Sequence, residues 1–362
     1  MRIAQVLFSL DMGGQEMMAL HLTKELLRRG HDVHVVSMSP GGTLRGEFAP
    51  AKIVDAPRKS ASGIDPKAWP TMWKALRSIQ PDVVHTHAPG PLLYGVPAAR
   101  LAGVKRIVHT SHGANVTQLN AKSIALGRAI VLLLTRFVPV SDETAETART
   151  REKIPERLIE VIPNGIPLDR FSANDETRAR IRGELGIPAD AFVVGTVGRV
   201  EAVKNHKLLV ASMAKIAGPG VHTVIVGGGS LLEEVRASIP AEARPFIHLI
   251  GPRRDVPDVL TAFDVFTLTS TTEGLPLAIP EAMATELPVV ATAVGSLPTI
   301  VPKDTGILVP SGDQEALTAA YKRLADNPLA RREMAKAARA FAHARFSLAK
   351  MVDAYEKIYK GG

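Results

Sequence analysis

Residues 273–281, which read EGLPLAIPE, are the stretch of this 362-residue chain that most directly predicts chemistry. Two carboxylates, Glu273 and Glu281, stand on either side of an apolar segment that contains Gly and Pro. An apolar run, VFTLTS, precedes them, and a helical pattern, IPEAMATE, follows. We expect a strand that ends at Ser270, then a loop, then a helix that starts near Pro280, because proline is favoured at the start of a helix.

The loop between the two glutamates predicts an anion-binding site. Backbone N–H groups from Gly274 to Ala278, together with the helix N-terminus, would point toward a ligand and bind phosphate oxygens. Glu281 also has a structural explanation, since a carboxylate in the first turn stabilises the helix dipole. Glu273 has no Lys or Arg close to it in sequence, so we expect it to contact a ligand.

The segment VGTVGRVEAVKNHK supplies positive charge. Arg199 and Lys204 follow a predicted strand within a Gly-containing turn. Arg binds a phosphate through two N–H groups and Lys binds it as a compact charge, so the two together could neutralise a diphosphate. Either residue alone would more simply be a surface cation.

Three further features of the sequence bear on phosphate binding. The triple glycine of VIVGGGSLLEEV resembles half of a dinucleotide fingerprint, but Leu replaces the third Gly, so nicotinamide binding is not expected. The chain has no Gly-Lys-Ser or Gly-Lys-Thr phosphate loop. Gly13 and Gly14 follow the first predicted strand, where their lack of a side chain would let the backbone approach a phosphate or an acceptor.

Four histidines end two neighbouring predicted strands in VVHTHAPG and VHTSHGAN. They could form a zinc site, or they could simply form hydrogen bonds at the strand ends, which we favour because no carboxylate lies at ligand spacing. His112 is the best placed to hydrogen-bond a sugar hydroxyl. The four are His85, His87, His109 and His112.

Composition limits the function further. The chain has no Cys, which excludes disulfides and thiolate chemistry and fits a reducing cytoplasm. Residues 1–170 carry 22 Lys and Arg against 15 Asp and Glu, whereas residues 171–362 carry 22 against 21. The basic first half indicates either an anionic partner, such as a membrane or a phosphorylated glycolipid, or an ordinary solvated surface. With two Trp and four Tyr, nucleic acid is the least favoured partner.

Apolar runs alternate with helical patterns over most of the chain, which predicts two α/β domains with parallel sheets. The first half gives strands at RIAQVLFSL, HDVHVVSM, DVVHTH, RIVHTS and RFVPVS. The pattern restarts after VIPNGIPLDRF with strands at FVVGTVGRV, HTVIVGGG, IHLIGP, VFTLTS and PVVATAV. A ligand is expected in a cleft that faces the carboxyl ends of both sheets.

Taken in order, these segments resemble retaining glycosyltransferases of the two-domain GT-B fold, in glycosyltransferase family 4. The resemblance covers nearly the whole chain and includes GGQEMMALHLTKELLRRGHDV, PDVVHTH, HTSHG, VGRVEAVKNHKLLV and FDVFTLTSTTEGLPLAIPEAMATELPVVAT. It implies an N-terminal acceptor domain over residues 1–168, a nucleotide-sugar domain over 169–345, and a helix over 346–362 that crosses back to the first domain. One departure is Asn205, where the family often has Gly.

The resemblance also implies roles for individual residues. The catalytic set would be His112, Arg199, Lys204 and Glu273. The donor-binding residues would be Gly14, Arg199, Lys204, Arg253, Glu273, Gly274, Leu275, Pro276, Leu277 and Glu281.

The implied reaction is transfer of a sugar from a UDP- or GDP-sugar to a hydroxyl of a saccharide, glycolipid or small molecule, with retention, without a metal and without any cofactor. The enzyme would be cytoplasmic, with possible attachment of its basic domain to the inner face of an anionic membrane. Two alternatives stay open. One is a sugar-nucleotide epimerase or hydrolase of the same fold, and the other is a non-catalytic binder of carbohydrate or lipid head groups.

Overall fold

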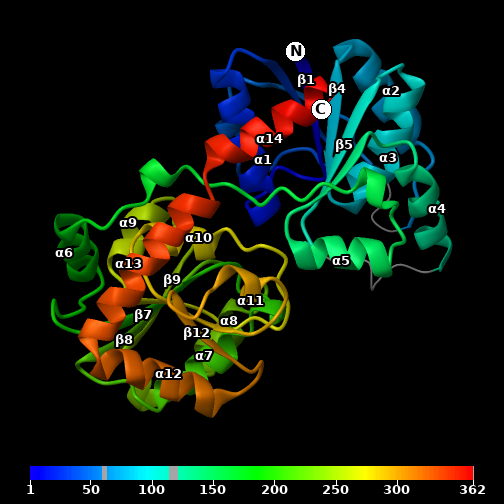
Figure 1. The fold of residues 1–362 in the computed structure, drawn as a ribbon. Coiled ribbons are helices and arrows are strands. Elements are labelled where there is room, and N and C mark those ends of the chain that lie inside the picture. Colours follow the sequence, from blue (N-terminus) through cyan, green and yellow to red (C-terminus); the bar gives the residue numbers. More distant parts are fainter. Residues whose placement is uncertain (59–62, 114–120, 362) are drawn as a thin grey trace. The chain divides into compact units, whose positions relative to one another are not determined.

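The computed structural model describes residues 1–58, 63–113 and 121–361, with the backbone alone for 121–125 (Figure 1). The chain divides into two compact units. The N-terminal unit comprises Met1–Ile166 and Leu348–Gly362, and the C-terminal unit comprises Pro167–Ser347. Every helix in the described part of the chain is too short or too polar to span a bilayer.

The N-terminal unit is built on a sheet of six parallel strands. Across the sheet these are β3 (Lys52–Asp55), β2 (Asp32–Ser37), β1 (Arg2–Leu7), β4 (Val83–His87), β5 (Arg106–Ser111) and β6 (Arg136–Pro139). The chain adds β2 and β3 on one side of β1 and then adds β4 to β6 on the other side. The carboxyl ends of β1 and β4 therefore flank a switch point, the place in such sheets where ligands bind.

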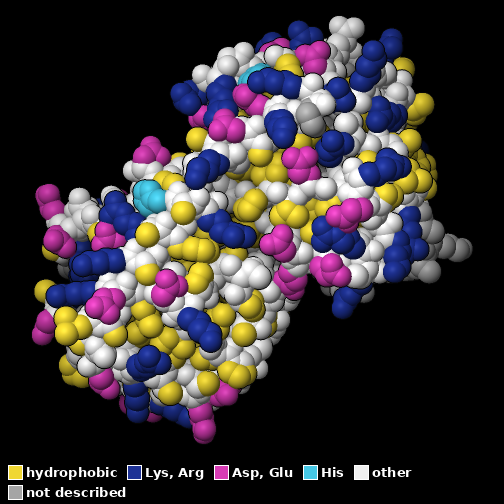
Figure 2. All heavy atoms as spheres, in the orientation of Figure 1, with side chains coloured by type: hydrophobic (Ala, Val, Ile, Leu, Met, Phe, Trp, Pro, Cys, Tyr) yellow, Lys and Arg dark blue, Asp and Glu magenta, His cyan; other side chains and the backbone are white. Residues whose placement is uncertain are grey.

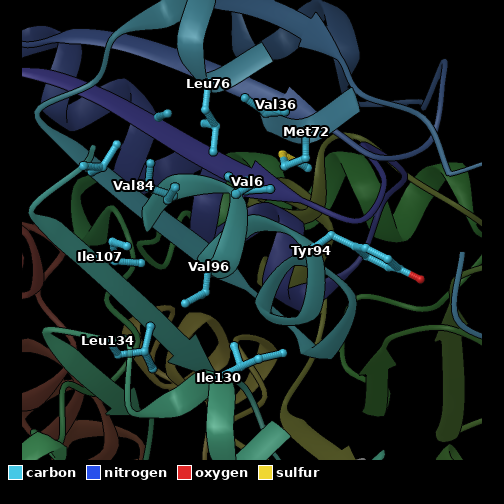
Figure 3. Packing of buried hydrophobic residues seen from close by; sticks show 14 of the residues in the cluster. Val6, Val36, Met72, Leu76, Val84, Tyr94, Val96, Ile107, Ile130 and Leu134 are labelled. Atoms are coloured by element: carbon cyan, nitrogen blue, oxygen red, sulfur yellow. The ribbon is translucent and has the colours of Figure 1, made fainter. Parts of the chain in front are cut away.

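Helices cover both faces of this sheet. Inward-facing residues of β1, β4 and β5 form the core shown in Figure 3, together with Met72, Tyr94 and Val96. This core lies under α2 (Ala68–Ile79), α3 (Pro89–Leu101) and α4 (Ala121–Val131). On the opposite face, Leu7 and Val35 pack against α1 (Gly14–Arg28). The helix α5 (Asp142–Thr150) follows β6.

The last helix of the chain, α14 (Leu348–Lys360), belongs to the N-terminal unit and packs beside α1 (Figure 1). Arg29 at the end of α1 forms an ion pair with Asp353, at 2.5 Å, and His31 contacts Glu356 at 2.8 Å. The predicted return of the C-terminal helix to the first domain is therefore confirmed.

The C-terminal unit repeats the topology of the first. Its six parallel strands are, across the sheet, β12 (Gly306–Val309), β11 (Val289–Thr292), β10 (Val265–Leu268), β7 (Phe192–Val197), β8 (Val221–Val226) and β9 (Ile247–Gly251). Here the switch point lies between the carboxyl ends of β7 and β10. The expected pair of doubly wound α/β domains is confirmed, and each sheet has its own switch point.

Eight α-helices of the C-terminal unit flank this sheet. They are α6 (Asp175–Glu184), α7 (His206–Ala214), α8 (Leu232–Ala237), α9 (Val256–Thr261), α10 (Ala278–Ala284), α11 (Leu297–Ile300), α12 (Gln314–Asp326) and α13 (Pro328–Arg345). Leu209 and Met213 of α7 and Leu317 and Tyr321 of α12 fill one core with strand residues such as Val194.

The boundaries correct the sequence analysis in detail. The strand before the EGLPLAIPE segment ends at Leu268, two residues earlier than expected, and α10 starts at Ala278 and not near Pro280. Pro280 is the third residue of α10, where its missing N–H has no intrahelical acceptor to lose. The edge strands β3 and β12 and the helices α4, α5, α6, α11, α12 and α13 were not predicted.

Candidate active site

The strongest feature of the C-terminal switch point is an ion pair between two predicted site residues. Lys204 Nζ donates a hydrogen bond to Glu273 Oε1 at 2.6 Å, and Ser270 Oγ donates to the same oxygen at 2.5 Å. Both charged side chains are largely shielded from solvent, with 18% and 9% of their surface exposed. Sequence spacing gave no partner for Glu273, because Lys204 lies 69 residues away and reaches it only through the pairing of β7 with β10.

Hydrogen bonds hold the turn after β7 against the loop after β10. Lys204 ends a short 3₁₀ turn, Ala202–Lys204. Thr269 Oγ1 donates to the carbonyl oxygens of Lys204 and Asn205, at 3.0 Å each, and the Thr271 amide donates to Val203 O at 2.8 Å. Asn205 has a φ of +48°, a left-handed conformation that Gly and Asn tolerate better than other residues. This explains how Asn can stand where the family often has Gly.

The loop after β11 supports the backbone of Glu273 from the other side. A Cβ atom on Gly295 would lie 1.9 Å from the carbonyl oxygen of Glu273, and Gly295 has a φ of +56°. Ser296 Oγ donates a short hydrogen bond to Gly274 O, and Thr292 Oγ1 donates to Ser270 O at 2.6 Å. The Gly-Ser pair after a strand marks a turn, but its spacing from Glu273 in the sequence does not predict this supporting role.

The loop from Gly274 to Leu277 presents unpaired donors. Within the described chain, the amides of Gly274, Leu277 and Ala278 donate no hydrogen bond. Leu275 and Leu277 are buried and anchor the loop, while Gly274 and Pro276 are partly exposed. A loop with anchored side chains and unpaired N–H groups is suited to binding an anion.

Glu281 lies in the fourth position of α10 and is partly buried. Burial raises the pKa of its carboxyl group to about 7, an effect that the charge of Arg170 partly offsets. Its side chain makes no hydrogen bond or ion pair among the residues that the structure describes. A shielded carboxyl without a partner is available to a ligand, and ligand hydroxyl groups would favour its ionised form.

The two other predicted cations differ in their surroundings. Arg199 is exposed in the turn after β7, and within the described residues its guanidinium forms no hydrogen bond or ion pair. Arg253 follows the edge strand β9 and donates to Asp255 at 2.6 and 2.8 Å and to Glu184 at 3.3 Å. Arg199 is therefore available to bind an anion. Arg253 already has carboxylate partners, and among the described residues no hydrogen bond or ion pair joins it to another predicted site residue.

Gly14 is the first residue of α1, directly after the loop that follows β1. A Cβ atom at this position would meet no atom within 4 Å. The packing of the described residues therefore does not require glycine here.

The N-terminal switch point carries histidines. His112, which follows β5, has its Nε2 3.2 Å from His87 Nδ1, and His87 Nε2 lies 2.6 Å from Gln5 Oε1. Burial lowers the pKa of His112 to about 4 and places that of His87 well below its usual value. Because of this low pKa, His112 is neutral near pH 7. Its side chain retains some exposed surface, so a ligand can still reach it.

The four histidines do not converge on one point. His85 contacts Tyr359 OH and Thr110 Oγ1, at 2.6 and 2.7 Å, on the same face of the sheet as His87. His109 contacts Thr86 on the opposite face, at 2.9 Å. The described residues contain no group of three or more His, Cys, Asp or Glu that could hold a metal. The hydrogen-bonding explanation of these histidines therefore fits the geometry.

Two family models match the chain over most of its length. Residues 12–170 match the family described as Glycosyltransferase Family 4, and residues 191–327 match Glycosyl transferases group 1.

Individual relatives and solved structures agree with these matches. The chain is 31% identical to an Escherichia coli UDP-Gal:alpha-D-GlcNAc-diphosphoundecaprenol alpha-1,3-galactosyltransferase, over 82% of this chain and 79% of that protein. It is 30% identical to a Streptomyces fradiae 2-deoxystreptamine N-acetyl-D-glucosaminyltransferase, over 85% and 81%. The fold matches the crystal structure of Anabaena HepE in complex with UDP-glucose, with a TM-score of 0.87 at 20% identity over the full length of both chains.

Proposed function

The chain belongs to glycosyltransferase family 4, and on that premise we propose that it transfers a hexosyl group, with retention, from a UDP-sugar to a hydroxyl of a lipid-linked saccharide. That it is a glycosyltransferase with a nucleotide-sugar donor follows from its relatives. The choice of UDP and of a lipid-linked acceptor is supported by the E. coli relative, whose name gives UDP-Gal and a diphosphoundecaprenol acceptor.

The observation that carries the proposal is the contact of Lys204 with Glu273 at the C-terminal switch point, at 2.6 Å. A lysine ammonium has three N–H donors, so Lys204 can hold Glu273 and still donate to phosphate oxygens. Arg199, whose guanidinium forms no hydrogen bond or ion pair within the described chain, would add a second cation for the same diphosphate. The unpaired amides of Gly274 and Leu277 would complete a site for the anion.

In the proposed reaction the bond between the anomeric carbon and the phosphate oxygen breaks, and its electron pair stays on the departing diphosphate. Lys204 and Arg199 stabilise this developing charge, which is the interaction that lowers the barrier most in such reactions. The acceptor oxygen bonds to the anomeric carbon from the face that the diphosphate leaves, and the acceptor proton passes to a phosphate oxygen. Atoms and charge balance without a metal ion, because the two side chains supply the positive charge.

The remaining predicted residues would bind the substrates. Glu281 would accept hydrogen bonds from the ribose hydroxyls, which favours its ionised form. Glu273, held by Lys204 and Ser270, would bind the donor sugar. His112 would hydrogen-bond a sugar hydroxyl, and Gly14 would leave room for the phosphates. The side chain of Arg253 is engaged by Asp255, so we propose that its contact with the base is made mainly through the backbone.

An exposed surface around Leu101 and Leu132 of the N-terminal unit supports the proposal that this unit contacts an anionic membrane. Leu101 and Leu132 are 76% and 58% exposed, and Arg100 brings their two segments together by donating to Leu133 O at 2.8 Å. The cations Lys105 and Arg128 are exposed in the same segments. Figure 2 shows Lys and Arg side chains spread widely over the N-terminal unit. Exposed leucines beside cations suit the surface of an anionic bilayer.

The membrane proposal has a matched test. Leu132→Asp should reduce sedimentation of the protein with vesicles that contain anionic lipid, at low salt. Leu329→Asp is the control, because Leu329 is a comparably exposed leucine, at 73%, in the C-terminal unit. Equal sedimentation of both variants and the unchanged protein would contradict the proposed membrane contact of this surface.

The donor and the reaction are tested together by incubating the protein with UDP-, GDP- and ADP-sugars, with and without lipid-linked acceptor and with chelator present. The expected result is an acceptor-dependent product from a UDP-sugar that has the anomeric configuration of the donor by NMR. Free sugar or an epimerised donor without acceptor would support the hydrolase or epimerase alternative. Tight nucleotide binding without turnover would support a non-catalytic binder.

A further inference from the structure

A layer of polar side chains lies inside the N-terminal unit, on the face of the sheet that α14 covers. Successive strand residues alternate between faces, so Val84 enters the core of Figure 3 while His85 and His87 point the other way. The layer consists of Gln5, His85, His87, Thr110, Tyr355 and Tyr359, all fully or almost fully buried.

Hydrogen bonds divide this layer, together with the partly exposed His112 beside it, into two groups. In one group, His85 contacts Tyr359 and Thr110, and Thr110 contacts Tyr355 at 2.7 Å. In the other group, Gln5 contacts His87 at 2.6 Å and His87 contacts His112 at 3.2 Å. The second group, which we call the Gln5 relay, comprises Gln5, His87 and His112. It alone ends at a residue that the proposed function puts beside the sugar.

The donors and acceptors of the Gln5 relay follow from its chemistry. In the amide orientation that the structure gives Gln5, its Oε1 faces His87 Nε2 while its own Nε2 is buried without a partner among the described residues. An amide oxygen can only accept, so in this orientation His87 Nε2 carries the proton. Buried His87 is neutral and has one N–H, which leaves its Nδ1 as an acceptor. His112 Nε2 must then donate to that atom, and a neutral His112 keeps a bare lone pair on Nδ1. Each hydrogen bond fixes the next one.

We propose that Gln5 and His87 are positioning residues that hold His112 in its Nε2–H tautomer, with Nδ1 free to accept a hydrogen bond from a substrate hydroxyl. The rings of His87 and His112 lie edge to edge, with centroids 5.5 Å apart and 28° between their planes, as a hydrogen bond between ring nitrogens requires. The expected effect of the relay on turnover depends on the proposed transferase function. The tautomer of His112 does not depend on that function, because it follows from the hydrogen bonds alone.

The first test is nitrogen-15 NMR of the imidazole side chains in the full-length, ligand-free protein at pH 7. The expected result is a neutral His112 with its proton on Nε2, and the same tautomer for His87. A proton on His112 Nδ1, or an imidazolium, would overturn the relay regardless of any activity.

The second test compares variants. His87→Phe keeps a ring but removes both hydrogen bonds, and it should lower kcat by about 10- to 100-fold with little change in the KM of the donor, because small displacements of catalytic groups have effects of that size. His87→Asn can place an amide oxygen near the position of Nδ1 and should recover part of the loss. Gln5→Leu removes the hydrogen bond at the other end of the relay. It should lower kcat in the same way, and it replaces His87→Phe as the test if that variant does not fold.

Tyr359→Phe is the matched control. It removes a buried hydrogen bond of 2.6 Å in the same layer, but in the group that does not reach His112. It should reduce stability while leaving the His112 tautomer and kcat unchanged. Unchanged kcat in both His87→Phe and Gln5→Leu, or an equal fall in Tyr359→Phe, would overturn the inference. A wild-type protein without transferase activity would instead overturn the proposed function, and the NMR result would still decide the relay.

Discussion

The two sheets share one strand order but carry different chemistry at the same place. At the carboxyl ends of β4 and β5 the histidines are neutral, since burial lowers the pKa of His112 to about 4 and that of His87 well below its usual value. At the ends of β7 and β10 they are charged, with Lys204 paired to Glu273 and Arg199 free within the described residues. Topology therefore fixes where a ligand can bind, and strand-end residues decide what it can be.

The difference suggests a division of work. A diphosphate needs positive charge where its own charge develops, and the C-terminal switch point provides it. Sugar hydroxyls need directed neutral donors and acceptors, and the histidines of the N-terminal switch point provide those. If this division is correct, substitutions in the C-terminal unit should affect nucleotide binding and catalysis most, and those in the N-terminal unit should have smaller effects.

The largest effect is expected for Lys204→Ala. Loss of one preorganised donor to the leaving group should lower kcat by about 100- to 1,000-fold in steady-state assays of sugar transfer. Lys207→Ala is the control, because Lys207 is a neighbouring lysine that pairs with Glu234 on the exposed surface of the same unit. A loss of less than tenfold in Lys204→Ala would mean that the charged switch point does not stabilise the leaving group.

The next largest effect is expected for Gly295→Ala. Its methyl group would collide with Glu273 O, displacing the carboxylate side chain and weakening binding of the UDP-sugar by tenfold or more in calorimetry, about the effect of losing one hydrogen bond to a charged group. Gly312→Ala is matched to it, since Gly312 also has a positive φ, of +83°, but has no neighbour within 4 Å of the added atom. Both should lose about 1 kcal/mol from the left-handed backbone. Normal binding of the UDP-sugar by Gly295→Ala would show that the loop after β11 does not support Glu273.

Glu281→Gln should separate stability from binding. The folded pKa of Glu281, about 7, lies above its ordinary value of 4.5, so the folded protein holds an extra proton between these values. The residue's contribution to stability is present below pH 4.5 and is lost as the pH rises toward 7. Relative to wild type, the variant should therefore gain about 1–3 kcal/mol between pH 5 and pH 8, since one pKa unit is 1.36 kcal/mol.

The measurement is thermal unfolding of both proteins at several pH values, combined with UDP titration at pH 8. The variant should unfold at a higher temperature than wild type at pH 8 and should bind UDP more weakly. A stability difference that does not change with pH would mean that Glu281 is not held in its shielded environment. Undiminished UDP binding would remove it from the donor site.

The sequence predicted the central strands because each is an apolar run with a clear boundary, whereas β3 and β12 are four-residue edge strands, of which β3 has no buried residue and β12 has two. It also predicted Glu273 and Lys204 as site residues, since both follow strands that end at one edge of the sheet. It could not predict their contact, which depends on β7 lying beside β10, or the alternation that places His87 and Gln5 together. Arg253 shows the opposite case, a residue expected to bind the donor whose side chain is already paired with carboxylates. The sequence does not show that Arg253 and these carboxylates form hydrogen bonds.

The smallest effect, and the sharpest test of the N-terminal switch point, is expected for Gly14→Ala. A methyl group here meets no protein atom, and alanine is the better helix former, so stability should be unchanged or should rise by up to about 1 kcal/mol. Gly183→Ala is matched to it, because Gly183 also lies in a helix with open space around the added atom. If donor phosphates approach the loop after β1, Gly14→Ala should raise the KM of the donor several-fold while Gly183→Ala leaves it unchanged. An equal KM in both variants would mean that no ligand contacts Gly14, and diphosphate binding would then rest on the charged groups of the C-terminal unit alone.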